Sequence, residues 1–207
     1  MRADALRRRE ALIEAACELV RTRHEDSIPL EAIAQRAGVG IATLYRNFPD
    51  RISLRHACAA HLFNEAVALL EEARDAMASA PATVVEEAWT DLMWSLVRLG
   101  LGAIVPVFVP TDVHELPEDL QAITARVLEL LNEVASDAQR AGLLDPEIDG
   151  LTVLVGLFTA SRPQVEGLNA LVPDLEATMV KIYLRGLQPR TPQNPSVEAS
   201  TPSAHCA

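Results

Sequence analysis

The stretch that most limits how this chain can fold is residues 28–51, which read IPLEAIAQRAGVGIATLYRNFPDR. Pro29 suits the first position of a helix, because the N–H that proline lacks has no partner there. The residues that follow carry apolar side chains at the spacing of one buried helical face. Gly38 comes next and can turn the chain through a left-handed conformation without steric cost. A short helix of about two turns is therefore expected, with its buried face formed by Leu30, Ile33, Ala34 and Ala37.

A second short helix is expected from about Gly40 to Asn47. Leu44 and Phe48 are four residues apart, so they lie on the same side and can be buried together. The helix should stop before Pro49, because a residue that precedes proline disfavours the helical conformation. Two short helices joined by a glycine turn are typical of a helix-turn-helix unit, so this stretch predicts a DNA reader.

Residues 37–48, AGVGIATLYRNF, resemble the recognition segment of the TetR family of transcriptional regulators. The family's first helix resembles residues 12–20, and its basic residue at the start of the fourth helix falls on Arg51. The sequence departs from the family at Gly40, where serine or threonine is usual, at Ala42, where glycine is frequent, and at Pro29, where threonine is common. The resemblance implies an N-terminal helix-turn-helix DNA-binding domain, a C-terminal helical domain for ligand binding and dimerisation, and a homodimer.

The whole chain of 207 residues, 49% of them hydrophobic, can bury a sizeable core in one or two domains. Its longest apolar run, residues 99–109, is interrupted by Pro106 and is too short to span a membrane. The N-terminus opens with charged residues and lacks the apolar core of a secretion signal. Three cysteines far apart do not suggest a disulfide framework or a thiolate metal site. These features predict a cytoplasmic protein.

The charge is distributed unevenly. The formal net charge is −11, yet residues 1–56 hold ten arginines against eight acidic residues, whereas residues 57–207 hold eight basic residues against twenty-one acidic ones. An acidic body repels phosphate and leaves the N-terminal part as the surface that can dock on DNA. A mildly acidic body is also common among soluble proteins, so this asymmetry supports DNA binding without requiring it.

Helical periodicity continues along the rest of the chain, and no strand-like alternation or internal repeat occurs. The fold class is therefore all-α. We predict a DNA-binding domain over residues 1–50, an effector-binding and dimerisation domain over 51–187, and a disordered tail rich in Pro, Ser and Thr over 188–207. The helices expected outside the helix-turn-helix are 4–21, 51–80 with Asp50 as N-cap, 83–102, 116–141, 146–161 and 173–187.

No pattern of an enzyme is present: no metal-binding histidine spacing, no glycine-rich phosphate loop and no nucleophile elbow. His56 and His61 are five residues apart, which points them in different directions on a helix. His114 stands alone in an expected loop, where a solvated histidine is the simpler interpretation. No catalytic residue, metal or cofactor is predicted.

The predicted DNA contacts lie on the second short helix. Tyr45 and Asn47 can donate to phosphates, and Thr43 and Arg46 can reach phosphates or bases. Ile41 can either lie at the edge of the core or contact a thymine methyl group, and the resemblance favours the contact. Arg51 is expected to hold the DNA backbone, the alternative being a surface arginine beside Asp50. The full predicted set is Gly40, Ile41, Thr43, Tyr45, Arg46, Asn47 and Arg51.

A ligand site is predicted in the body, where large apolar side chains gather in sequence around Arg98. Taken singly, such residues fill cores more often than they line sites. Arg98 can anchor a polar ligand group or extend to the surface. The resemblance implies an effector cavity among the fourth to seventh helices, so we predict a small apolar or amphipathic effector near Trp89, Met93, Trp94, Arg98 and Phe108.

The last two helices carry more apolar surface than a pair at the edge of a monomer would hide. An isologous four-helix contact with a second copy would bury both faces at once. The predicted interface residues are Leu151, Val155, Phe158, Leu175, Met179 and Ile182. The sequence thus predicts a ligand-responsive repressor that binds a palindromic operator as a homodimer. The alternatives are a helical DNA-binding or adaptor protein without a small-molecule switch and, less favoured, a small helical enzyme.

Overall fold

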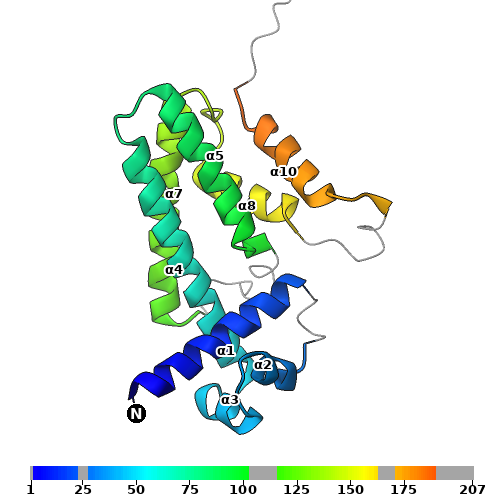
Figure 1. Ribbon diagram of the computed structural model, residues 1–207. Coiled ribbons are helices and arrows are strands. Elements are labelled where there is room, and N and C mark those ends of the chain that lie inside the picture. Colours follow the sequence, from blue (N-terminus) through cyan, green and yellow to red (C-terminus); the bar gives the residue numbers. More distant parts are fainter. Residues whose placement is uncertain (1, 23–27, 103–115, 163–170, 190–207) are drawn as a thin grey trace, which may run out of the picture.

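The computed structural model of the protein describes residues 2–22, 28–102, 116–162 and 171–189, and throughout these residues the regular secondary structure is α-helical (Figure 1). The all-α fold class is therefore confirmed. The first three helices form one end of the molecule, which we call the head (residues 2–22 and 28–50). The remaining helices form the body.

The head consists of α1 (Arg2–Thr22), α2 (Leu30–Arg36) and α3 (Ile41–Asn47), with α1 lying across the two short helices (Figure 1). The side chains that hold the three helices together are almost completely buried, as expected for a unit whose helices are too short to be stable alone. They include Leu12, Ile28, Leu44 and Phe48.

The long helix α4 (Arg51–Met77) connects the head to the body. It begins with a capping box, in which Ser53 N donates to the Asp50 carboxylate at 2.7 Å and the Ser53 side chain interacts with the Asp50 backbone. The predicted N-cap is thus confirmed. In the body α4 packs against α5 (Ala82–Arg98) and most extensively against α7 (Glu118–Arg140). The helix that carries the head is therefore in direct contact with both α5 and α7 of the body.

The body ends with α8 (Gly150–Ala160) and α10 (Leu175–Gly186), which pack on one another beside α5 and α7 (Figure 1). The Tyr183 hydroxyl lies 2.9 Å and 3.0 Å from the carbonyl oxygens of Thr152 and Val153, to which it donates across the two helices. A Cβ at Gly156 would collide with the Tyr183 ring. Half-burial of Tyr183 raises its pKa to about 12, so the hydroxyl keeps its proton at neutral pH.

Most predicted helices have their expected positions, but one begins four residues later than predicted. Residues 146–149 are not helical, because Asp145 accepts from Glu147 N at 2.9 Å in a tight turn and Asp149 caps α8 by accepting from Thr152 N at 2.7 Å. Pro29 likewise is the N-cap of α2 and not its first residue. At the start of α8, the side-chain oxygens of Asp145 and Asp149 compete with helical hydrogen bonds and set the boundary.

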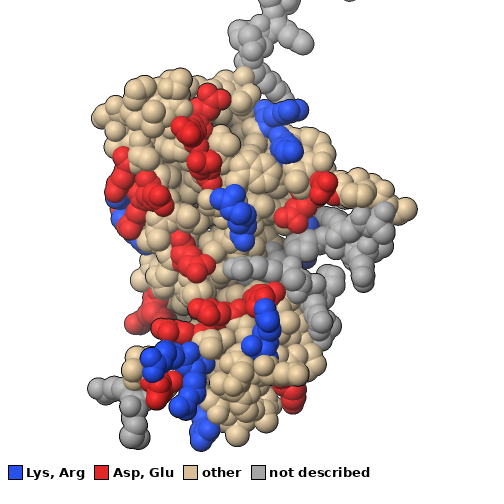
Figure 2. Space-filling model, viewed as in Figure 1, with Lys and Arg blue, Asp and Glu red and all other residues tan. Residues whose placement is uncertain are grey.

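The space-filling view shows several basic side chains gathered at the head and many acidic ones spread over the body on the same face (Figure 2). The uneven charge of the sequence is therefore uneven in space too. Of the helices described, none is both long and apolar enough to cross a membrane.

Candidate nucleic-acid interface

The turn between α2 and α3 fixes how α3 is presented. Gly38 has φ 67°, the left-handed conformation predicted for it, and its N–H and that of Val39 donate to Gln35 and Ala34 at 3.1 Å and 3.0 Å. Leu44 and Phe48, 0% and 1% exposed, anchor the inner side of α3 in the head. Because this inner side is sealed, the outer side of α3 is free to face a partner.

The outer side of α3 carries polar and aromatic side chains. Tyr45 and Arg46 are exposed, and Thr43 is half-buried. Arg46 donates to the Thr43 hydroxyl at 3.0 Å, and the Asn47 amide donates to the Thr43 backbone oxygen at 2.8 Å. Asn47 is therefore partly engaged within its own helix, which leaves Tyr45, Arg46 and the second N–H of Asn47 as donors toward an outside partner.

Gly40 and Ile41 lie at the N-terminus of α3. Gly40 is the exposed N-cap, with no side chain to bond the first turn, and a Cβ at this position would meet no atom within 4 Å. Ile41 is half-buried and packs against the head core. Part of Ile41 thus belongs to the core edge, one of its two predicted roles, while the rest still faces outward.

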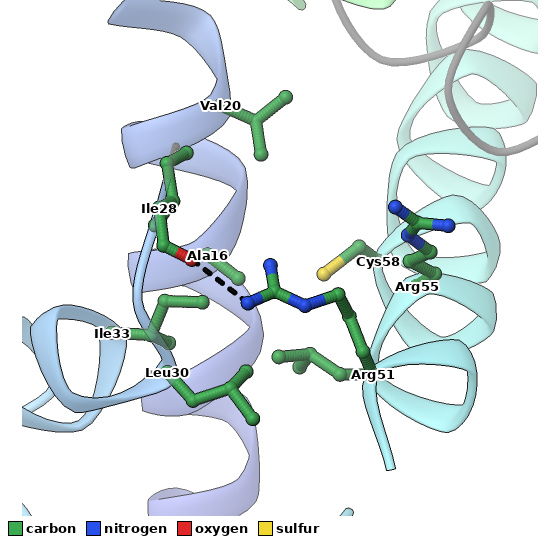
Figure 3. Close-up of a pocket in the computed structure, with 9 residues that line it drawn as sticks. Ala16, Val20, Ile28, Leu30, Ile33, Arg51, Arg55 and Cys58 are labelled. Carbon is green, nitrogen blue, oxygen red and sulfur yellow. Dashed lines mark hydrogen bonds between the residues drawn. The ribbon is translucent and has the colours of Figure 1, made fainter. Parts of the chain in front are cut away.

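Arg51 begins α4 and points back toward the chain that enters α2 (Figure 3). Its guanidinium donates to the backbone oxygen of Ile28 at 3.0 Å. Around it lies a small apolar pocket of about 20 Å³, enough for one water molecule. This bond ties α4 to the start of α2, a role that the sequence did not reveal because the two residues are 23 positions apart. The pocket is lined by Ala16, Val20, Ile28, Leu30, Ile33, Arg51, Leu54, Arg55 and Cys58.

Two further contacts brace the head from α1. The Arg9 guanidinium lies 4.9 Å from the centre of the Phe48 ring, a cation–π contact. Arg36 Nε donates to Glu18 at 2.9 Å and joins α2 to α1, and this carboxylate raises the pKa of Arg36. Neither pair is evident from the sequence, because the members of each pair are far apart along the chain and have no periodic relation.

In the body, the predicted ligand residues do not form one group. Trp89 and Met93 are buried and Trp94 is half-buried, and all three border a groove of about 200 Å³ between α5 and α10. Arg98 is exposed, donates to Ser95 at 2.8 Å, and borders a different groove between α4 and α5. Arg98 and Trp89 are nine positions apart and so lie on opposite sides of α5, and the single ligand site that joins them stays a prediction. Phe108 lies outside the described residues.

The predicted dimer residues lie on α8 and α10. Four of them are exposed although they are large and apolar: Leu151, Val155, Met179 and Ile182. The other two, Phe158 and Leu175, are half-buried. The two helices thus leave an apolar surface uncovered in the single chain.

Comparison with known proteins agrees with this geometry. Residues 12–58 match the family model of the bacterial regulatory proteins of the tetR family, a segment that covers the second half of α1, all of α2 and α3 and the start of α4. A comparison with curated proteins finds no match.

Several solved structures resemble the chain over nearly its whole length. A TetR transcription regulatory protein from Mycobacterium vanbaalenii is 26% identical over 90% of this chain and 98% of its own, with a TM-score of 0.55. A TetR transcriptional regulator from Streptomyces coelicolor is 25% identical, with coverages of 88% and 99% and a TM-score of 0.50. A regulatory protein TetR from Rhodobacter sphaeroides, 19% identical over 85% of this chain and 96% of its own, shares the fold with a TM-score of 0.55.

A helix-turn-helix head, joined by one long helix to an all-α body, defines a DNA-binding transcriptional regulator. Residues 12–58 carry the DNA-binding segment of the TetR family, and the chain resembles solved TetR regulators over nearly its whole length.

Proposed function

We propose that the protein is a one-component repressor. Two copies would bind an operator with two-fold symmetry, and a small apolar or amphipathic molecule bound in the body would release them. Residues 1–50 would read the DNA, and residues 51–187 would hold the effector and form the dimer.

The observation that carries the proposal is the presentation of α3. Its inner side is buried at Leu44 and Phe48, while Tyr45 and Arg46 extend outward from a head richer in basic residues than the rest of the chain. A rigid helix with outward donors suits the major groove, where Arg46, Thr43 and Ile41 would read base edges. Gly40, Tyr45 and Asn47 would position the head on the DNA backbone. Arg51 would act indirectly, by holding α4 to the chain that enters α2.

The uncovered apolar surface of α8 and α10 supports the dimer. A second copy related by two-fold symmetry presents the same surface, so each protomer would cover the exposed side chains of the other. Dimerisation would place two heads side by side, as an operator with two half-sites requires.

Operator selection from randomised duplexes tests the DNA-binding part of the proposal. Selected sites should contain inverted repeats with centres about 34–36 Å apart, one helical turn, or somewhat more. Changing Thr43 or Ile41 to Ala should alter the preferred base at particular positions, whereas Tyr45→Phe should weaken binding to all sequences alike. Weak binding without sequence preference, unaffected by these substitutions, would refute the proposal.

A DNA-binding adaptor without a small-molecule switch is the second candidate. The burial of Trp89 and Met93 favours it, because most of the surface of both side chains is packed in the body core and only a small part borders the groove between α5 and α10. Thermal unfolding in the presence of candidate effectors separates the two. A regulator with a switch gains stability as the effector concentration rises, whereas an adaptor does not.

A further inference from the structure

The groove between α5 and α10 differs in chemistry from the other surfaces of the body. Its α5 wall contributes Trp89, Met93 and Trp94, and its α10 wall contributes Lys181, Leu184 and Arg185. Its volume is about 200 Å³. Ligand pockets for drug-sized molecules usually have about 300–1,000 Å³, so this groove suits a smaller molecule. Glu86, Thr90, Leu143 and Gln188 complete its lining.

Two cations meet at one side of this groove. Lys181 and Arg185 are four residues apart on α10, so their side chains project from the same side of the helix and repel one another. Within the described ranges, neither forms an ion pair with a carboxylate, and Glu86 is the one acidic residue that lines the groove. An anion bound between the two cations would relieve this repulsion.

The rest of the groove offers apolar surface from both of its walls. Trp94 and Leu184 are only half-buried, so each leaves apolar area in contact with water that a ligand could cover. The groove thus combines a flat aromatic wall with a pair of cations. The molecule that complements both has a short apolar part and a single negative charge at one end.

We propose that this groove binds a small amphipathic carboxylate. Its carboxylate group would lie between Lys181 and Arg185, and its apolar part would cover Trp94 and Leu184. Guanidinium and ammonium donors form charge-assisted hydrogen bonds with carboxylates, which are stronger than those between neutral groups. Binding here requires no contact with Arg98, which borders the other groove.

The position of the groove connects it to regulation. The same α10 that carries Lys181 and Arg185 also carries the exposed Met179 and Ile182 of the proposed dimer surface. A ligand that ties α10 to α5 would favour one arrangement of this surface over another. This consequence rests on the proposed function, whereas the binding itself does not.

Intrinsic fluorescence tests the proposal directly, because both tryptophans of the chain, Trp89 and Trp94, line the groove. The probe is phenylbutyrate, and phenylbutyramide, which has the same shape without the charge, is the matched control. Phenylbutyrate should change the fluorescence in a saturable way, with the amide at least about tenfold weaker. Lys181→Gln and Arg185→Gln should each weaken phenylbutyrate binding at least about fivefold. Arg98→Gln should leave the affinity for phenylbutyrate unchanged.

A second measurement does not depend on variants. Lys181 is the only lysine of the chain, so reductive methylation with a ¹³C label gives one lysine side-chain signal, distinct from that of the N-terminal amine. Phenylbutyrate should shift this signal and phenylbutyramide should not, because methylation retains the positive charge.

Several results would overturn the proposal: no saturable change up to about 10 mM phenylbutyrate, equal affinity for the amide, or loss of binding only in Arg98→Gln. Affinity for the selected operator, measured without phenylbutyrate, tests the proposed function separately. If the protein binds the operator but not phenylbutyrate, this inference is wrong and the proposed function stands. If it binds phenylbutyrate but shows no operator preference, the proposed function is wrong and this inference stands.

Discussion

The outer side of α3 and the outer side of the α8–α10 pair are both left uncovered in the single chain, but their chemistry is opposite. On α3 the exposed side chains include Tyr45 and Arg46, which are stable in water. On α8 and α10, Val155 and Ile182 are 53% and 57% exposed, although they are apolar. A polar surface can bind and leave its partner, whereas a contiguous apolar surface favours a lasting one. Under the proposed function, this difference corresponds to a transient DNA contact at one end and a lasting contact with a second copy at the other.

The largest expected effect concerns the apolar surface. Replacing Val155 and Met179 together with Glu would place two uncompensated charges in each half of the dimer contact. We expect the dissociation constant of the dimer to rise at least about 10³-fold, which corresponds to roughly 4 kcal/mol. Sedimentation should then show monomers, and operator affinity should fall with the loss of the second head. Ala122→Glu, at an exposed site on α7, is the control and should remain dimeric. A dimer that survives the double substitution would place the interface elsewhere.

The second prediction concerns the sealed inner side of α3. Phe48→Ala removes a side chain that is 1% exposed and also removes the ring beneath Arg9. Truncating a buried phenylalanine costs about 3–5 kcal/mol, so the head should unfold at lower denaturant concentration than the wild type. Chemical unfolding followed by circular dichroism measures this. Tyr45→Ala on the exposed side of the same helix should change stability by no more than about 0.5 kcal/mol. Similar losses for both variants would mean that α3 has no distinct inner and outer sides.

The third prediction compares two arginines of the DNA-binding end. Arg46 extends outward, whereas Arg51 donates to Ile28 inside the head. A lost phosphate contact lowers the dependence of log affinity on log salt by about one unit. Arg51→Ala should weaken operator binding by about 1 kcal/mol through misplacement of α2 while leaving the salt dependence unchanged. Arg46→Ala should lower the salt dependence if it contacts phosphate, or change base preference if it reads a base. A reduced salt dependence in Arg51→Ala would contradict this and support the phosphate contact of Arg51 that the sequence predicts.

The smallest expected effect concerns the junction between the two ends. Hydrogen bonds from Ser53, first from its backbone N–H, lower the pKa of Asp50 below the ordinary value of 3.8. The folded carboxylate therefore contributes stability that is fully present above 3.8 and is lost as the pH falls through the lowered pKa. Asp50→Asn keeps an acceptor oxygen for the cap but cannot titrate. It should be slightly less stable than wild type at neutral pH, with the difference disappearing in acid.

Denaturant unfolding of both proteins from about pH 7 to pH 2.5 measures this difference. Asp149, whose pKa is lowered by hydrogen bonds from the Thr152 side chain and backbone, still titrates in both proteins and serves as the internal reference. Identical pH profiles for the two proteins would show that the cap of α4 does not contribute through its charge.

The sequence by itself determined the features that depend on a few neighbouring residues. The apolar spacing of residues 30–37, the left-handed Gly38 and the Asp50 cap each act within about two helical turns, so their outcome did not need the rest of the chain. The helix start predicted at Pro146 failed at the same scale, because the capping side chains of Asp145 and Asp149 outweighed the periodicity. The separation of Arg98 from Trp89 also follows from helical geometry alone.

Only the tertiary structure decided which distant residues meet. Arg51 donates to the carbonyl oxygen of Ile28. Lys181 and Arg185 line the same groove as Trp94, which lies about ninety positions earlier in the chain. No periodicity joins such pairs, since their distance depends on how whole helices pack and not on local spacing. The sequence therefore located the helix-turn-helix, which lies in one continuous segment. It did not reveal the groove between α5 and α10, because its two walls are brought together only by the packed body.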